Sequence, residues 1–372
     1  MSRSVTMSLA LGGIWVFFAL SHPAFLSARN LSLLMIELAV TATLALGMLL
    51  VLLPGQIDLS VGSGVGLFGG VAAVLVFQQG WPAPAALGLG LIAAVLVWSA
   101  MGALVVRQRI PAFIITLGGL LVFKGLHWLV IRNRTVPVAE GGGQNLYSLL
   151  TTHYLPPTAG WALATAAGAG WVAIQVRSRH RRRQLGFPAE DPEPFFLRVF
   201  IALQTVALLT LVANQYRGLP LAGLLLAAVA LAVHVVTRHT PFGRYLYAIG
   251  GNEEAAALSG VPVTRVVVGA FAAMGAIVAF TGYMQTSYSG ASTTTIGNLM
   301  ELDAIAACVI GGTSLRGGRG SVVGVLFGSL VMASLLNGMT LMAVAPEVKL
   351  IARGSVLALA VWLDVRFSAS TA

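Results

Sequence analysis

Charged residues are scarce in this chain of 372 residues. Asp, Glu, Lys and Arg together make up 9% of it, whereas hydrophobic residues make up 57%. A water-soluble domain has about a quarter of its residues charged, so this composition leaves too little polar surface to cover a soluble globule. Cysteine is scarcer still, with Cys308 alone. A single cysteine excludes a disulfide within the chain and a cysteine-based metal cluster.

Lysine occurs only twice, as Lys124 after a phenylalanine and as Lys349 after a valine. The phosphate-binding loop of an ATPase needs a lysine that directly follows a glycine, so the chain lacks this way of binding ATP. The six histidines form no HExxH pair and have no cysteine partners of the kind that zinc sites use. We therefore expect no metal, no cofactor and no catalytic residue, and hence a chain that is not an enzyme.

Long apolar runs are what the sequence has in place of charge. A helix needs about 20 apolar residues to cross a membrane, and backbone groups in lipid must be hydrogen-bonded within the chain. The runs do not alternate apolar and polar residues, as barrel strands would. They predict an all-α, polytopic membrane protein with about 10–12 transmembrane segments in a single domain, residues 1–372. The candidate segments are 5–21, 33–53, 59–77, 85–106, 111–131, 159–176, 198–213, 218–237, 265–283, 298–312, 322–342 and 348–363.

The basic residues indicate the orientation, because cytoplasmic loops of membrane proteins carry an excess of Lys and Arg. If the amino terminus is cytoplasmic and the segments alternate, fifteen basic residues fall in internal loops and five in external loops. We therefore expect both termini in the cytoplasm, together with the basic insertion loop 177–196. Its proline-rich end is expected to be non-helical. Its arginines are interpreted as anchoring charge beside membrane lipid, not as a site for nucleic acid.

One internal repeat is visible. GSGVGLFGG at 62–70 matches GSVVGVLFG at 320–328 in five of nine positions. Many transporters consist of two related halves, with discontinuous helices near the middle of the membrane. The repeat, together with the short glycine-rich segments, predicts two related halves with broken helices.

The internal loop 238–264 predicts a short, well-defined helix. Asn252 is a favourable N-cap residue. Glu253 and Glu254 place negative charge at the positive end of the helix dipole, and Gly260 ends the helix. A plain connector helix is one interpretation; a rigid lever that docks into a motor protein is the other, and we favour it. The residues assigned to this coupling role are Gly251, Asn252, Glu253, Glu254, Ala255, Ala256, Ser259 and Gly260.

Two further stretches hold candidate residues of a pathway or of a helix break. In LPGQIDLSVGSG, an acid at the edge of lipid has a partner or a task, and we expect it to stabilise the start of the next helix. In MELDAIAACVIGGTSLRGGRGS, two acids begin a helix that adjacent glycines interrupt. Capping with anchoring charge and a broken helix beside a pathway both remain open. The residues concerned are Asp58, Ser60, Ser63, Asp303, Gly311 and Gly312.

Three motifs occur together that are typical of one family. IDLSVGS at 57–63, YAIGGNEEAAALSG at 247–260 and ELDAIAACVIGGTSLRGGRGS at 301–321 resemble the sugar-permease branch of the bacterial ABC importers. The resemblance covers about residues 33–364, and it is strongest to the xylose type within the ribose/xylose branch. The shorter stretches that match the xylose type are GWPAP at 80–84, RIPAFIITLGG at 109–119, YLPPTAG at 154–160 and the basic insertion at 177–186.

The resemblance implies a multi-pass protein of the bacterial inner membrane that forms the path for a monosaccharide, a pentose such as xylose. It also implies a permease homodimer, cytoplasmic ATP-binding subunits and a periplasmic sugar-binding protein, with helix 252–260 similar to a coupling helix. The stretches 283–300 and 346–355 depart from the xylose pattern, so the sugar is less well defined than the family.

Two other transport functions compete with this interpretation. A branched-chain amino-acid permease belongs to the same superfamily, but the sugar-type motifs at 57–63 and 301–321 weigh against it. A proton-coupled secondary transporter needs acids or histidines in mid-membrane as a relay. Here the acids gather at helix ends or in loops, with Glu37 as the exception.

Overall fold

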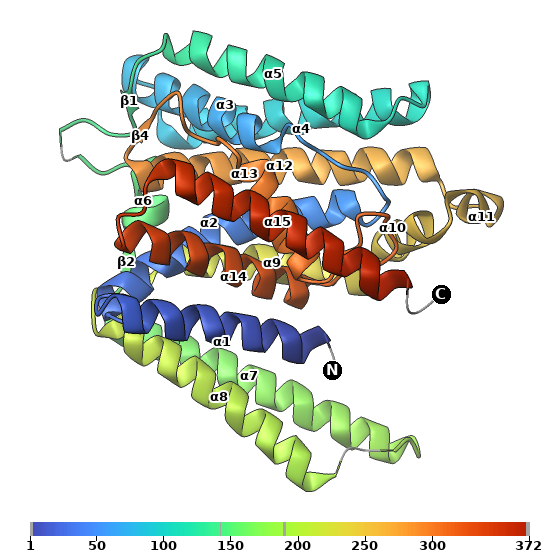
Figure 1. Ribbon diagram of the computed structural model, residues 1–372. Helices are drawn as coiled ribbons and strands as arrows, with labels where there is room; N and C mark the ends of the chain where they lie inside the picture. Colours follow the sequence, from blue (N-terminus) through green and yellow to red (C-terminus); the bar gives the residue numbers. More distant parts are fainter. Residues whose placement is uncertain (1–2, 142, 189–190, 370–372) are drawn as a thin grey trace.

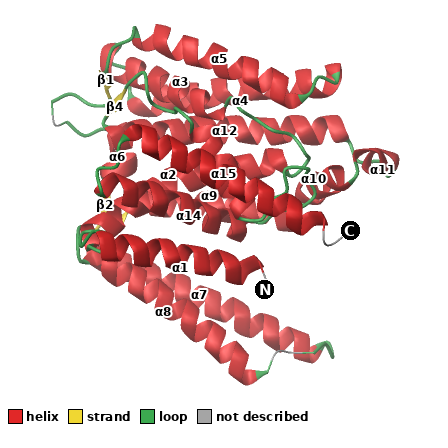
Figure 2. Ribbon diagram, viewed as in Figure 1, coloured by secondary structure: helices red, strands yellow, loops and turns green. Residues whose placement is uncertain are grey.

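The computed structural model describes residues 3–141, 143–188 and 191–369, and nearly all of this chain is helical (Figures 1 and 2). The expected all-α class is therefore confirmed. The helices are α1 (Arg3–Ser21), α2 (Ala28–Leu52), α3 (Val61–Ala73) with its π-helical continuation η1 (Val74–Gln78), α4 (Ala83–Gln108), α5 (Ala112–Ile131), α6 (Leu146–Thr152), α7 (Pro157–Gln184), α8 (Pro192–Asn214), α9 (Leu221–His239), α10 (Pro241–Gly251), α11 (Glu253–Leu258), α12 (Val263–Ser289), α13 (Met300–Ile310), α14 (Val322–Leu341) and α15 (Pro346–Ala369).

Nine helices in the described chain are long and apolar enough to cross a membrane, namely α2, α3 with η1, α4, α5, α7, α8, α9, α12 and α14. Every apolar segment expected from the sequence coincides with a helix, and the three beyond these nine are α1, α13 and α15. The apolar part of α1 is short, Met7–Ser21. Helix α13 has only 11 residues, as expected of a broken helix, and α15 is long but carries charged side chains.

The long helices run side by side, so the molecule has two ends (Figure 1). At the end that we call the strand end, two short antiparallel strand pairs fasten the connections. They are β1 (Val136–Pro137) with β4 (Ala291–Ser292), and β2 (Tyr154–Leu155) with β3 (Leu219–Pro220). At the opposite end, which we call the projecting end, α10 lies at the edge of the bundle and α11 extends beyond it (Figure 1).

Helix α2 lies at the centre of the bundle, in contact with α9, α12, α13 and α14. Close approach of the central helices depends on glycine. A Cβ atom at Gly282 of α12 would lie 2.5 Å from the carbonyl oxygen of Val65, and one at Gly275 would lie 2.5 Å from that of Ala94. Backbones that approach this closely gain dispersion contacts, which drive helix association in lipid.

The two copies of the glycine repeat pack against one stretch of chain. A Cβ atom at Gly66 of α3 would meet the carbonyl oxygen of Ile296 at 2.6 Å, whereas Gly324 and Gly328 of α14 lie against the backbone of Gly311 and Ala307. The 296–311 region, which contains α13, is thus in contact with both copies. That the two halves of the chain are related stays a prediction.

Helices α7 and α8 form a hairpin that diverges from the bundle, with its tip toward the projecting end (Figure 1). The insertion 177–196 is mostly helical: α7 continues to Gln184 and α8 starts at Pro192. The expectation that its proline-rich end is non-helical holds for Phe187, Pro188 and Asp191. It was wrong for Pro192 and Pro194, which occupy the first turn of α8. Proline is tolerated there, since the first amides of a helix have no partner within it.

In the connection 132–158, the run GGG and the adjacent Pro156 and Pro157 favour a loop. The connection nevertheless contains the helix α6. Asn145 and Ser148 form a reciprocal capping box at its start, with the Ser148 amide donating to Asn145 Oδ1 over 2.9 Å. Tyr147 of α6 is fully buried and donates its hydroxyl to the Gly69 carbonyl oxygen over 2.8 Å. Helix α6 therefore seals part of the strand end.

Candidate functional site

The projecting helix α11 begins and ends where the sequence signals lie. The side chain of Asn252 accepts a hydrogen bond from the Ala255 amide over 2.9 Å, which confirms it as the N-cap of α11. Gly260 has φ +83°, a left-handed conformation that other residues adopt only at a cost. The sequence missed α10, in which Gly251 is the last helical residue and Thr240 is the N-cap.

The side chains of α11 divide into an outward and an inward set. Glu253, Glu254 and Ala255 are exposed, and Leu258 is 90% exposed. Ala256, by contrast, is buried in the hydrophobic core of this chain. Of the residues assigned to the coupling role, Ala256 therefore holds α11 onto the bundle, while the others present it outward.

Helix α10 is fastened to the bundle by a contact that we call the glycine junction, made of Leu53, Gly250, Gly317 and Gly318. The Gly318 amide donates to the Leu53 carbonyl oxygen over 2.9 Å. A Cβ atom at Gly250 would collide with that same carbonyl oxygen and with the Gly318 amide, whereas one at Gly251 would meet nothing within 4 Å. Only glycine fits at position 250.

A second contact lies beside the glycine junction. The Tyr247 hydroxyl of α10 donates to the Gly320 carbonyl oxygen over 2.9 Å. Burial raises the pKa of Tyr247, so its hydroxyl keeps the proton that it donates at neutral pH. Residues 311–321 connect α13 to α14, so the glycine junction and Tyr247 hold α10 against the segment that follows α13.

Asp58 lies just before α3 and is fully buried. One carboxylate oxygen accepts from the Ser60 amide over 2.8 Å and from the Ser60 hydroxyl over 2.6 Å, and the other accepts from Trp98 Nε1 over 2.7 Å. Asp58 thus orders the start of α3, as expected. The bond to Trp98 of α4 was not visible in the sequence. Ser63 donates to the Ser60 carbonyl oxygen over 3.0 Å.

The short helix α13 is held by an ion pair. Arg353 Nη2 of α15 lies 3.4 Å from Asp303 Oδ2, with the two side chains 26% and 8% exposed. The other oxygen of Asp303 has no partner among the described residues. Sequence reasoning singled out Asp303 but not Arg353, although a lone arginine inside an apolar segment was a signal for it.

A polar cluster that includes Glu37 joins three of the long helices. Glu37 of α2 accepts from the Tyr288 hydroxyl of α12 over 2.9 Å and from Asn337 Nδ2 of α14 over 3.1 Å. Asn337 in turn accepts from Asn30 Nδ2 over 2.9 Å. Glu37 is therefore bound to neutral donors and not to a second acid or a histidine, which is an arrangement for holding helices together.

The candidate residues thus form two groups instead of one. The coupling residues lie at the projecting end, whereas Gly311 and Gly312 follow α13, and Gly311 lies against Gly324 of α14. Asp58, Ser60 and Ser63 lie at the start of α3, and Asp303 faces α15. The two acidic stretches meet through Gly62 of α3, where a Cβ atom would collide with Glu301 of α13.

A bundle of long apolar helices, with a short helix inside it and a capped helix projecting from one end, is the architecture of a multi-pass membrane protein. Comparison with known families identifies the kind of membrane protein. Residues 30–361 match the family described as branched-chain amino acid transport system / permease component. The chain belongs to this family. It is thus a multi-pass permease component of a bacterial ABC importer and is not itself catalytic.

Permeases named for two sugars, xylose and ribose, are similar to the chain along nearly its whole length. The chain is 41% identical to the Xylose transport system permease protein XylH of Escherichia coli K12, over 96% of this chain and 90% of that protein. It is 40% identical to XylH of Haemophilus influenzae, over 96% and 95% of the two chains. It is 31% identical to the Ribose import permease protein RbsC of Bacillus subtilis, over 95% and 90%. No solved structure matches the chain.

Proposed function

We propose that this chain forms the translocation path for a pentose such as xylose. The observation that carries the proposal is the 41% identity to a xylose permease along nearly the whole length of both chains. The family description refers to branched-chain amino acids, but the ribose permease is also similar over 95% of the chain. The sugar relatives therefore favour a monosaccharide over an amino acid.

The working assembly is a homodimer of this chain, with cytoplasmic ATP-binding subunits at the projecting end and a periplasmic sugar-binding protein at the strand end. In this assembly α11 docks onto the ATP-binding subunit. Its exposed Leu258 supplies apolar contact area, and Glu253 and Glu254 supply charge. Motion of α11 then reaches α13 through α10 and the glycine junction.

The direct test reconstitutes the chain in liposomes with its ATP-binding subunit and its sugar-binding protein. We expect ATP-dependent accumulation of xylose and none of leucine. Accumulation driven by a proton gradient without the ATP-binding subunit would refute an ABC importer, and accumulation of leucine would favour an amino-acid permease. Exchange of the sugar-binding protein for a related one that still docks should change the imported sugar, since the described spans offer few polar groups to match hydroxyls.

The docking of α11 has its own test. Leu258→Asp should abolish co-purification of the ATP-binding subunit, because it places a charge in the contact. Leu26→Asp is the matched control: Leu26 is also exposed, at 52%, but precedes α2 at the strand end. If Leu258→Asp retained the ATP-binding subunit as well as Leu26→Asp does, α11 would be only a connector.

Orientation is tested with single cysteines in a Cys308→Ser background. Ser178 and Ser259 are expected inside and Ser289 outside, so an impermeant thiol reagent should label only position 289 in intact cells. Labelling at 178 or 259 from outside would overturn the orientation. Ser370, near the expected cytoplasmic end, lies outside the described residues.

A further inference from the structure

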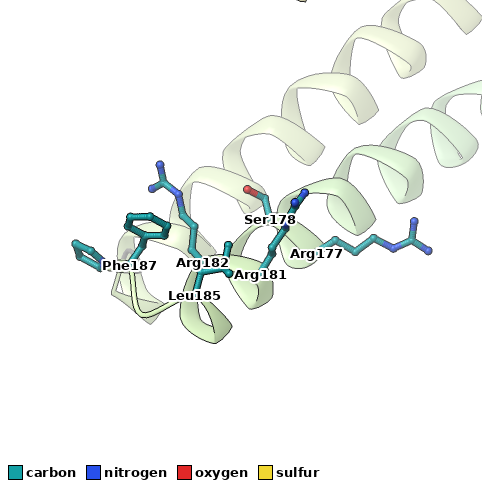
Figure 3. Close-up of a pocket in the computed structure, with 7 residues that line it drawn as sticks. Arg177, Ser178, Arg181, Arg182, Leu185 and Phe187 are labelled. Carbon is teal, nitrogen blue, oxygen red and sulfur yellow. The ribbon is translucent and has the colours of Figure 1, made fainter.

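The tip of the α7–α8 hairpin contains a pocket that plays no part in transport or coupling as described above. Its volume is about 660 Å³. Figure 3 shows its side chains, which come from the last turns of α7 and from the turn that follows. The lining residues are Arg177, Ser178, Arg181, Arg182, Leu185, Phe187 and Pro188.

The lining combines positive charge with apolar surface. Among the lining residues that the structure describes, three are arginines, Leu185, Phe187 and Pro188 form an apolar wall, and none is acidic. A guanidinium group binds phosphate through two parallel N–H groups. Arg179 does not share this task, because its guanidinium group lies 4.7 Å from the ring of Phe195 and holds α7 to α8. The lining therefore suits an anionic phosphate that is attached to an apolar group.

The surroundings of the pocket indicate where such a ligand comes from. The hairpin presents apolar side chains outward along both helices: Ile174 is 65% exposed on α7 and Leu208 is 61% exposed on α8. Only 11% and 6% of their membrane-spanning stretches are buried within the chain. The outer faces of the hairpin therefore suit contact with lipid, and the arginines follow directly after the apolar part of α7.

The level of the hairpin tip along the bundle favours a lipid ligand over a protein partner. In Figure 1 the tip ends about level with α5, whereas α11 projects well beyond both. A subunit docked on α11 meets the projecting helices first, while the tip lies where apolar helix surface gives way to charge. That level is where phospholipid headgroups lie.

We propose that this pocket binds the phosphate headgroup of an anionic phospholipid. The exposed side chains of Arg177, Arg181 and Arg182, which point apart in Figure 3, turn onto the phosphate, and Leu185 and Phe187 lie against the upper acyl chains. Basic pockets beside transmembrane helices bind acidic headgroups in this way. The site fixes the hairpin at the membrane surface, which its few contacts with the bundle do not. The inference depends on the chain spanning a membrane, but not on the sugar or on the direction of transport.

The experiment uses the full chain in nanodiscs of equal parts phosphatidylglycerol and phosphatidylcholine. The protein is then transferred to detergent, and native mass spectrometry counts the lipids that it retains. We expect preferential retention of phosphatidylglycerol. The triple variant Arg177→Gln/Arg181→Gln/Arg182→Gln should lower that preference by roughly tenfold or more, because each arginine near the headgroups adds to the attraction.

Two matched variants make the result specific. Arg107→Gln/Arg109→Gln/Arg265→Gln removes three exposed arginines elsewhere on the chain and should retain phosphatidylglycerol as the unmodified chain does. Phe187→Glu keeps every arginine, and therefore the charge that sets orientation, but places a carboxylate in the pocket. It should lose the preference as the triple variant does.

The outcomes decide the proposal either way. Equal loss in the two triple variants would mean general attraction to charge and would overturn the pocket, as would full retention by Phe187→Glu. An excess of inorganic phosphate during the transfer is the last arm. If it displaced all phosphatidylglycerol, the site would be one for free phosphate; continued retention supports the lipid.

Discussion

The membrane-spanning stretches of α2 and α8 have the same mean hydropathy, 2.2, but they differ in burial. In α2, 78% of the membrane-spanning stretch is buried inside the protein, whereas in α8 only 6% is. Hydropathy therefore indicates that both helices enter a membrane and says nothing about which one the protein packs around. Lipid tails are as apolar as leucine, so apolar surface gains nothing by exchanging lipid for protein.

Small and polar residues account for the difference in burial between α2 and α8. Among the buried residues of α2 are Asn30, Ser32, Thr43 and Gly47, and a Cβ atom at Gly47 would meet Met274 and Ile277 of α12 at close range. On α8 only Thr210 and Ala213 are buried. In membranes small residues permit close backbone approach and polar residues join helices, which matches this contrast.

The largest expected effect tests the contrast with one substitution in each helix. Leu49→Ala removes a fully buried side chain of α2 and should lower the free energy of unfolding by about 2–5 kcal/mol. Leu209→Ala acts on a side chain of α8 that is 52% exposed and should change it by less than about 0.5 kcal/mol. Unfolding in mixed micelles with increasing dodecyl sulfate measures both. Equal losses would show that α8 is packed as α2 is.

A smaller effect on stability is expected when two adjacent glycines, one tightly packed and one in open space, are compared. Gly250→Ala overfills the glycine junction and should cost about 1–3 kcal/mol, with a larger loss of sugar uptake because α10 can no longer seat against Leu53 and Gly318. Gly251→Ala, where the added methyl group meets nothing within 4 Å, should leave uptake unchanged. Uptake by both variants at matched abundance in the membrane is the measurement. Normal uptake by Gly250→Ala would show that coupling does not depend on the glycine junction.

The ion pair on α13 should give the next effect. Arg353→Gln leaves Asp303 nearly buried without its charged partner, whereas Asp303→Asn/Arg353→Gln removes both charges. A double-mutant cycle on the free energy of unfolding should give a coupling of roughly 0.5–3 kcal/mol, typical of residues in contact. Additive losses would show that the pair contributes nothing to holding α13 against α15.

The smallest effect compares the two ends of the molecule. Asn252→Ala and Asn145→Ala each remove a side-chain N-cap, from α11 and α6 respectively, and each should cost about 0.5–2 kcal/mol. Only Asn252→Ala should reduce co-purification of the ATP-binding subunit, because only α11 projects toward it. A similar reduction for Asn145→Ala would trace the loss to general destabilisation.

The sequence by itself determined the helical class, the position of every membrane segment and the ends of α11. These features depend on residues near one another along the chain: apolar runs of sufficient length, Asn252 one turn before the amide it accepts from, and Gly260 just after the last helical residue. The family followed from motifs that are equally local. Segments expected to be loops, at 132–158 and 177–196, became partly helical because a capping box and first-turn prolines were underestimated.

Only the tertiary structure decided which side chains meet. Asp58 finds Trp98 forty residues away, Leu53 meets Gly318, and Ala256, expected to face a partner, turns into the core of its own chain. No local pattern encodes these contacts, because in lipid a buried face and an exposed face are equally apolar. Burial is set by the closeness of backbones at glycine and by polar groups that need partners, and both depend on helices distant in sequence.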